Sequence, residues 1–200
     1  MPEFNERYHK LDTAQAYEEK IKTRRKLSTR LEFRMVGRSL DHVVGDKILD
    51  CPCGTGRIDE LLRERFSDIT GVDGAEAMFE VYMAGNPDRK GQVADIFNLP
   101  FADNEFDWTL CHRLFHHFKN DADRTALVSS LNRVSKNGFC FYAWVSVPFS
   151  RRGNRPGKSR QTVDVADIRK IVDQAGAKID EMYYAAWPFS PKVMVVCSAK

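Results

Sequence analysis

The chain has 200 residues, 42% of them hydrophobic and 30% charged, which is enough for one domain with a sizeable core and short for two. The net charge of +3 is too small to mark the whole chain as a nucleic-acid-binding protein. No apolar run approaches the roughly 20 residues needed to span a bilayer, and the first twenty residues contain no apolar signal segment, so we expect a cytoplasmic protein. The five cysteines, an odd number, favour reduced and buried thiols over a disulfide framework.

The elements follow in a regular order along the chain. Residues 13–40 are predicted to form one helix with a strongly basic polar face. Helices are then predicted at 58–66, 75–85, 121–138 and 163–176, with Asn120 or Asp121 as the N-cap and Gly138 as the end of the third of these. Strands are predicted at 47–51, 68–73, 91–96, 106–112, 139–147, 177–187 and 192–199.

This alternation predicts a doubly wound α/β sheet that is mostly parallel and closes with an antiparallel last strand. The run at 139–147 is apolar throughout, as expected for a strand buried on both faces. Residues 150–162 are rich in Gly, Pro, Arg and Ser and are predicted to be a mobile loop inside the domain.

The segment LDCPCGTGRI, residues 49–58, connects the first strand of this sheet to the helix that follows. Gly54 and Gly56 permit a positive φ and remove Cβ atoms that would keep a ligand off the backbone. The segment lacks the third glycine of a dinucleotide-binding fingerprint and the lysine of a phosphate-binding P-loop. Cys51 and Cys53 have no second cysteine pair elsewhere in the sequence, so no metal site is expected.

The spacing that does fit is Asp50-x-x-x-Gly54-x-Gly56. It resembles motif I of the class I S-adenosylmethionine-dependent methyltransferases, with Pro52 in place of the first glycine. Two further acids stand where this family has them: Asp73 ends the second predicted strand and Asp95 follows the third. The passage LPFADNEFDWTLCHRLFHHF is similar to that of the small-molecule branch called methyltransferase type 11.

The resemblance implies a Rossmann-like domain over 1–200 that binds S-adenosylmethionine, releases S-adenosylhomocysteine and needs no metal. It implies an N-terminal helical cap at 1–45, a cofactor-binding half at 46–145, and a substrate loop with closing strands at 146–200. Asp73 would accept both ribose hydroxyls, Asp95 would accept the adenine amino group, and Asp50 would accept from loop amides or indirectly from the methionine amino group. The remaining expected cofactor contacts are Ile96 and Phe97 against the adenine ring, together with Cys51, Pro52, Cys53, Gly54, Gly56, Gly74, Met78 and Cys111.

The acceptor side is less defined by the sequence. His116 or His117 could act as a general base, although either could instead pack beneath a loop or lie exposed. The arginines expected to bind an acceptor phosphate or carboxylate are Arg24, Arg25, Arg113, Arg151 and Arg152, and the alternative is a solvated basic face beside a flexible loop. The expected reaction is therefore methyl transfer to oxygen or nitrogen of a small, anionic molecule. Two other functions stay open: an RNA or protein methyltransferase, and a non-catalytic methyltransferase-like binding module.

Overall fold

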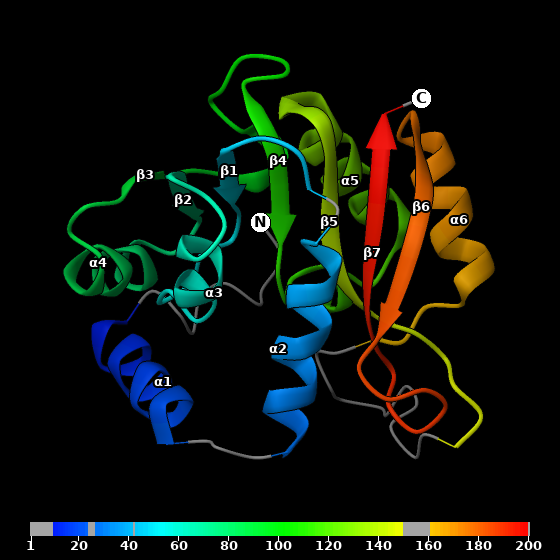
Figure 1. Ribbon diagram of the computed structural model, residues 1–200, viewed down its shortest axis with the longest axis horizontal. Helices are drawn as coiled ribbons and strands as arrows, with labels where there is room; N and C mark the ends of the chain where they lie inside the picture. Colours follow the sequence, from blue (N-terminus) through cyan, green and yellow to red (C-terminus); the bar gives the residue numbers. More distant parts are fainter. Residues whose placement is uncertain (1–9, 24–26, 42, 150–160, 200) are drawn as a thin grey trace.

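A computed structural model describes residues 10–23, 27–41, 43–149 and 161–199 of the chain. One seven-stranded sheet forms its centre, with the strand order β3-β2-β1-β4-β5-β7-β6 (Figure 1). The strands are β1 (Lys47–Asp50), β2 (Asp68–Asp73), β3 (Lys90–Val93), β4 (Phe106–Cys111), β5 (Ser135–Trp144), β6 (Ala177–Tyr184) and β7 (Lys192–Ala199). The helices are α1 (Leu11–Thr23), α2 (Leu27–Ser39), α3 (Asp59–Arg63), α4 (Glu76–Gly85), α5 (Asp121–Val134) and α6 (Val165–Gln174).

The predicted sheet is confirmed. β1 pairs in parallel with both β2 and β4, and β3 and β5 continue the parallel pairing outwards. β7 runs antiparallel between β5 and β6. This order reverses direction at β1, since the chain first adds strands on one side and then on the other, and ligands of such sheets bind at that switch point.

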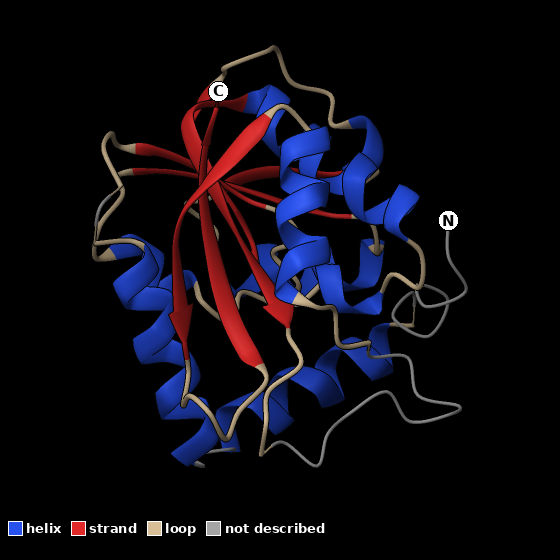
Figure 2. Ribbon diagram, turned by 90° about the vertical axis from the view of Figure 1, so that its right-hand side faces the viewer, coloured by secondary structure: helices blue, strands red, loops and turns tan. Residues whose placement is uncertain are grey.

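Helices cover both faces of the sheet (Figure 2). The alternation along β5 explains why this strand is apolar throughout. Phe139, Phe141 and Ala143 pack into the core shared with α5 and α6. Cys140 and Tyr142, on the opposite face, pack into the core shared with α2 and α3.

The N-terminal region differs from its prediction. Two helices, α1 and α2, occur where one helix over 13–40 was expected, and their axes point in different directions (Figure 1). They have different packing partners: α1 contacts α4, whereas α2 contacts β6 and β7. A single straight helix could not reach both partners, so the packing of the two halves overrides their shared helical pattern.

The end of α5 is the second correction. The helix was expected to continue to Gly138, but it ends at Val134 and β5 begins at Ser135. Gly138 lies within the strand, where a Cβ atom would come within 2.3 Å of the Cys197 carbonyl oxygen and 2.9 Å of the Trp108 ring. The glycine therefore allows close approach of neighbouring strands and does not end the helix. The N-terminal cap was predicted correctly, because the Asn120 side chain accepts from the backbone N–H of Asp123 at 2.8 Å.

Candidate cofactor and acceptor cleft

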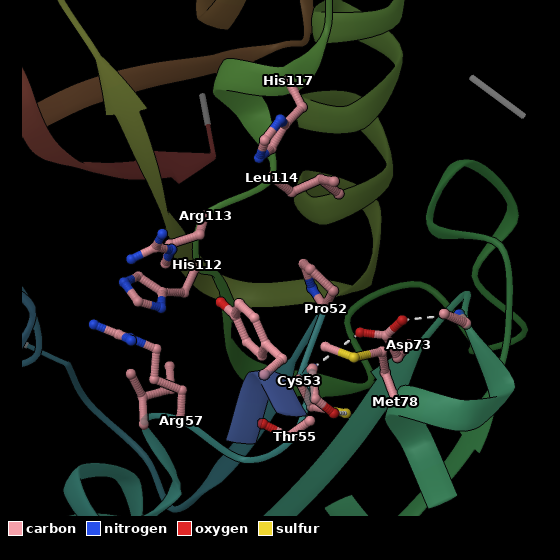
Figure 3. Close-up of a pocket in the computed structure, with 14 residues that line it drawn as sticks. Pro52, Cys53, Thr55, Arg57, Asp73, Met78, His112, Arg113, Leu114 and His117 are labelled. Atoms are coloured by element: carbon pink, nitrogen blue, oxygen red, sulfur yellow. Dashed lines mark hydrogen bonds between the residues drawn. The ribbon is translucent and has the colours of Figure 1, made fainter. Parts of the chain in front are cut away.

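A cleft of about 790 Å³, including its open mouth, lies at the carboxyl edge of the sheet. Its walls come from the segments that follow β1, β2 and β4, and Tyr17 of α1 contributes from the N-terminal region. Figure 3 shows an acidic end with Asp73 beside Met78, and a basic end with Arg57, His112 and Arg113.

The glycine turn after β1 has the predicted backbone conformation. Gly54 has a φ of +58° and Gly56 a φ of +84°, both in the region that side chains disfavour. The two glycines serve different purposes. A Cβ atom on Gly56 would meet Asn86 Nδ2 at 2.9 Å and Tyr82 Cδ2 at 3.1 Å, so this glycine makes room for α4. Gly54 faces the cleft, where its nearest neighbour would be Met78 Cε at 3.6 Å.

Asp73, the last residue of β2, ties two loops together. Its Oδ2 accepts from the Gly54 N–H at 2.9 Å and its Oδ1 accepts from the Ala75 N–H at 2.8 Å (Figure 3). The residue is buried yet lines the cleft. The carboxylate therefore sits at the cleft wall in an orientation fixed by the turns that follow β1 and β2.

Asp50, the last residue of β1, is fully buried, and neither of its carboxylate oxygens has a hydrogen-bond partner. Burial, together with the negative charges of Asp59 and Asp73, raises the pKa of this carboxyl well above its usual range. Because neither oxygen accepts a hydrogen bond, the loop amides, one of the two partners expected for Asp50, do not bind it. A buried acid without a partner is costly, and such groups are common where a ligand supplies the missing partner.

The residues expected around the adenine lie outside this cleft lining. Asp95 Oδ1 accepts from the Phe97 N–H at 3.1 Å and so caps the one-turn helix Ile96–Asn98. Phe97 packs on Phe118 with 5.4 Å between ring centroids, and Ile96 is half-buried against the cores. Of the expected cysteines, Cys53 lines the cleft, whereas Cys51 and Cys111 are buried in core clusters. The adenine and Cys111 roles remain predictions.

The two candidate bases have different environments. His117 lines the cleft. His116 is buried and stacks on Trp144 at 5.2 Å with an interplanar angle of 6°. This arrangement favours His117 over His116 for contact with an acceptor, while His116 holds the aromatic packing under β5.

A buried charge cluster at the basic end was not predicted. Glu32 of α2 is 1% exposed, and its carboxylate binds Lys192 Nζ. Its Oε1 also lies 3.1 Å from Arg113 Nη1, 3.4 Å from His112 Nε2 and 3.5 Å from Arg57 Nη2. Although burial opposes ionisation, the surrounding cations and His112 lower the pKa of Glu32 well below its usual range. Burial lowers the pKa of His112 to about 4, so its imidazole is neutral at pH 7.

The cluster joins residues from four separate parts of the chain. Glu32 and Lys192 are 160 positions apart, and no local motif connects them. The only sequence signal was Arg113, which was predicted as an acceptor contact and does line the cleft. The other predicted arginines, Arg24, Arg25, Arg151 and Arg152, lie outside the described residues.

Comparison with known proteins identifies the domain. A family model described as a methyltransferase domain matches residues 49–142, which include the glycine turn, Asp73 and the segment after β4. Over these residues the chain carries a methyltransferase domain. Demethylmenaquinone methyltransferase of Paenarthrobacter aurescens is 32% identical to it over 110 residues, covering 55% of this chain and 42% of that relative. The chain therefore matches less than half the length of this curated relative.

Solved structures show the same fold for the methyltransferase domain. Magnesium protoporphyrin IX methyltransferase from Synechocystis, crystallised with S-adenosylhomocysteine, has a TM-score of 0.68 at 16% identity, covering 86% of this chain and 84% of that one. An S-adenosylmethionine-dependent methyltransferase from Clostridium acetobutylicum has a TM-score of 0.68 at 14% identity, covering 94% and 98%. The predicted resemblance and sheet architecture are thus confirmed.

The residues of the methyltransferase domain fit its cofactor. Asp73 lies at the cleft wall with the carboxylate chemistry that ribose hydroxyls would require, and the unpartnered Asp50 lies beneath the turn where a cationic amino group would be stabilised. Within the described ranges, no group of three or more His, Cys, Asp or Glu side chains could hold a metal ion. No helix in the same ranges is long and apolar enough to cross a membrane.

Proposed function

We propose that the protein transfers the methyl group of S-adenosylmethionine to a small molecule bound in the cleft between Asp73 and Arg113. The observation that carries this proposal is Asp73, whose two oxygens fix the turns after β1 and β2 while the side chain still faces the cleft. The cofactor, when bound, supplies a sulfonium that is already an activated leaving group. The protein therefore has to align the acceptor and exclude water.

The chain's own residues supply this alignment. Asp73 and the Gly54 turn would orient the ribose and keep the cofactor in one position. His117, on the cleft wall, lies where it could take a proton from an acceptor, whereas His116 is held in the aromatic stack. The roles of both histidines remain predictions.

A small acceptor is favoured over a macromolecule by the shape of the site. The acceptor would enter a cleft closed on one side by Tyr17 of α1. Relatives over this segment are named demethylmenaquinone methyltransferases, and a structural neighbour acts, by its name, on magnesium protoporphyrin IX. Quinone-like and carboxylate-bearing aromatic compounds are therefore the first acceptors to screen with labelled S-adenosylmethionine. Transfer to oxygen or nitrogen and a cytoplasmic location remain predictions.

Ligand-dependent melting tests the cofactor site. S-adenosylhomocysteine should raise the melting temperature of the wild-type protein, because a ligand that binds only the native state stabilises it. Asp73→Asn should remove most of this rise. Asp107→Asn is a matched control, since Asp107 also accepts from two backbone amides, those of Asp46 at 2.9 Å and Lys47 at 3.0 Å, but away from the cleft lining.

The control separates loss of the site from loss of stability. Each variant replaces a carboxylate that accepts backbone N–H groups with a neutral amide that keeps one acceptor oxygen, so both should melt at or below the wild type. Only Asp107→Asn should retain the ligand-induced rise. If S-adenosylhomocysteine does not stabilise the wild-type protein, or if Asp73→Asn keeps the full rise, the proposed function is wrong.

A further inference from the structure

The basic end of the cleft carries more positive charge than its internal pairing needs. Among the described residues, Glu32 is the carboxylate that contacts this cluster, and Arg57, Arg113 and Lys192 each contribute a positive charge. His112 is neutral at pH 7. The cluster therefore has a net charge of about +2 (three cations minus one anion), and unneutralised buried charge favours an anionic ligand.

The two arginines have hydrogen-bond donors left for such a ligand. Each guanidinium has five N–H donors, and Glu32 takes one nitrogen of each, Nη2 of Arg57 and Nη1 of Arg113. Arg57 Nε is buried without a hydrogen-bond partner. Both side chains line the cleft and converge beside His112 (Figure 3).

Glu32 holds the guanidinium groups of Arg57 and Arg113 in place. It is anchored on α2, whose buried Met35 and Val36 pack against the sheet. Its Oε1 contacts both arginines, while Lys192 at the start of β7 binds Oε2. Phe33 further restricts Arg57, whose guanidinium carbon lies 5.5 Å from the ring centroid. Restricting two long side chains in advance lowers the entropy lost when a ligand binds.

We propose that Arg57 and Arg113 form a binding subsite for one carboxylate or phosphate group, and that Glu32 is the residue that positions them. The subsite rests on the proposed function, because the anion would belong either to the amino-acid end of the cofactor or to the methyl acceptor. Both sources share the same chemistry, a planar or tetrahedral oxyanion that a guanidinium recognises through paired hydrogen bonds.

Calorimetric titration with two nucleosides distinguishes the sources. S-adenosylhomocysteine carries a carboxylate, whereas 5′-methylthioadenosine has the same nucleoside and thioether without the amino-acid part. If the cofactor supplies the anion, Arg113→Gln should weaken S-adenosylhomocysteine binding by about ten-fold or more, the loss expected for a charged hydrogen-bonded pair, and leave 5′-methylthioadenosine binding unchanged. Arg57→Gln should act in the same direction. Arg65→Gln is the control, because Arg65 pairs with Asp41 and does not line the cleft.

If the acceptor supplies the anion, both nucleosides should bind the variants and the wild type equally. Phosphate or benzoate should then raise the melting temperature of the wild-type protein saturated with S-adenosylhomocysteine, measured against chloride at equal ionic strength. Arg113→Gln should abolish that rise, and Arg65→Gln should keep it.

Glu32→Gln tests the positioning role. Removing this negative charge makes the cluster more positive, so a purely electrostatic site would bind the anion more tightly. A positioning role predicts weaker anion binding instead, with 5′-methylthioadenosine affinity retained as proof of a folded cleft. If Glu32→Gln does not fold, Glu32→Asp serves the same purpose: it keeps the negative charge but shortens the side chain that holds the two arginines. A purely electrostatic site would then bind the anion as the wild type does, whereas a positioning role predicts anion binding that is weaker by several-fold.

The results also separate this subsite from the proposed function. If the wild-type protein binds neither nucleoside, both the proposed function and the anion subsite are wrong. A wild-type protein that binds both nucleosides, with no change in any anion's binding in Arg57→Gln or Arg113→Gln, overturns the subsite alone. Tighter anion binding in Glu32→Gln overturns the positioning role.

Discussion

His112 should make the folded protein measurably less stable in mild acid. Its imidazole is buried, and the pKa falls from 6.5 to about 4 because burial disfavours the charged form. Between these values the unfolded chain binds a proton that the folded protein does not, so the free energy of unfolding decreases as the pH falls. Integrating this difference from pH 7 to pH 5 gives a loss of about 2 kcal/mol from this one residue.

Two other titratable groups, Glu32 and Asp50, also make stability depend on pH, but they do not obscure the effect of His112. The lowered pKa of Glu32 stabilises the folded state above the unfolded value of 4.5, and this contribution is nearly complete at pH 5. The raised pKa of Asp50 acts in the opposite direction, since the folded protein binds the Asp50 proton more tightly than the unfolded chain does. A comparison of variants at each pH cancels the Asp50 contribution.

Urea denaturation of the wild type and of His112→Asn at pH 7, 6 and 5 measures the effect. The substitution itself costs stability at all three values, because His112 packs edge-on against Tyr142 at 5.2 Å. That cost should become smaller by about 2 kcal/mol between pH 7 and pH 5, since only the wild type loses the histidine contribution. His117→Asn, at the cleft wall, is the control for removing a histidine. A cost that is equal at pH 7 and pH 5 would refute the reasoning.

Three further predictions concern other parts of the structure. S-adenosylhomocysteine should bind more tightly as the pH rises through the raised pKa of Asp50, because only the ionised carboxylate stabilises a cationic amino group, and Asp50→Asn should flatten this dependence in calorimetric titrations. Gly56→Ala should lower the free energy of unfolding by about 1 to 2 kcal/mol, because an alanine at its φ of +84° is strained, whereas Gly85→Ala, with nothing within 4 Å of the added carbon, should change it little. Asn120→Ala should cost about 1 kcal/mol in chemical denaturation through loss of the α5 cap, and Asp164→Ala at α6, where the side chain makes no cap hydrogen bond, should cost less.

The sheet could be predicted from the sequence because the strands are recognised from local stretches of residues. The strands β1, β2, β4 and β5 are buried along most of their length, and the acid that ends β2 falls where the family places it. Gly138 misled the prediction because a glycine signals both the end of a helix and a close approach between strands. Local pattern cannot distinguish these, since the second depends on Trp108 and Cys197, far away in the chain.

The cleft was predictable at one end only. Asp50, Gly54 and Asp73 form a spacing that a single stretch of sequence can carry, and the structure brings their segments together at the carboxyl edge. Glu32 and Lys192 have no such pattern. Each is an isolated charge on an amphipathic element, and only the packing of α2 against β7 brings them to the same place as Arg113.

The burial of the cysteines has a practical consequence. All five thiols are free and buried, and burial raises the pKa of each, so few thiolates are available to react at neutral pH. Alkylation of the native protein therefore has to wait for the structure to open. Cys140 and Cys197 lie on the paired strands β5 and β7 and pack into cores on opposite faces of the sheet, so their labelling rates would follow opening of the sheet. Cys53 lines the cleft. The ratio of its labelling rate to those of Cys140 and Cys197 would report motion of the turn after β1 without any added probe.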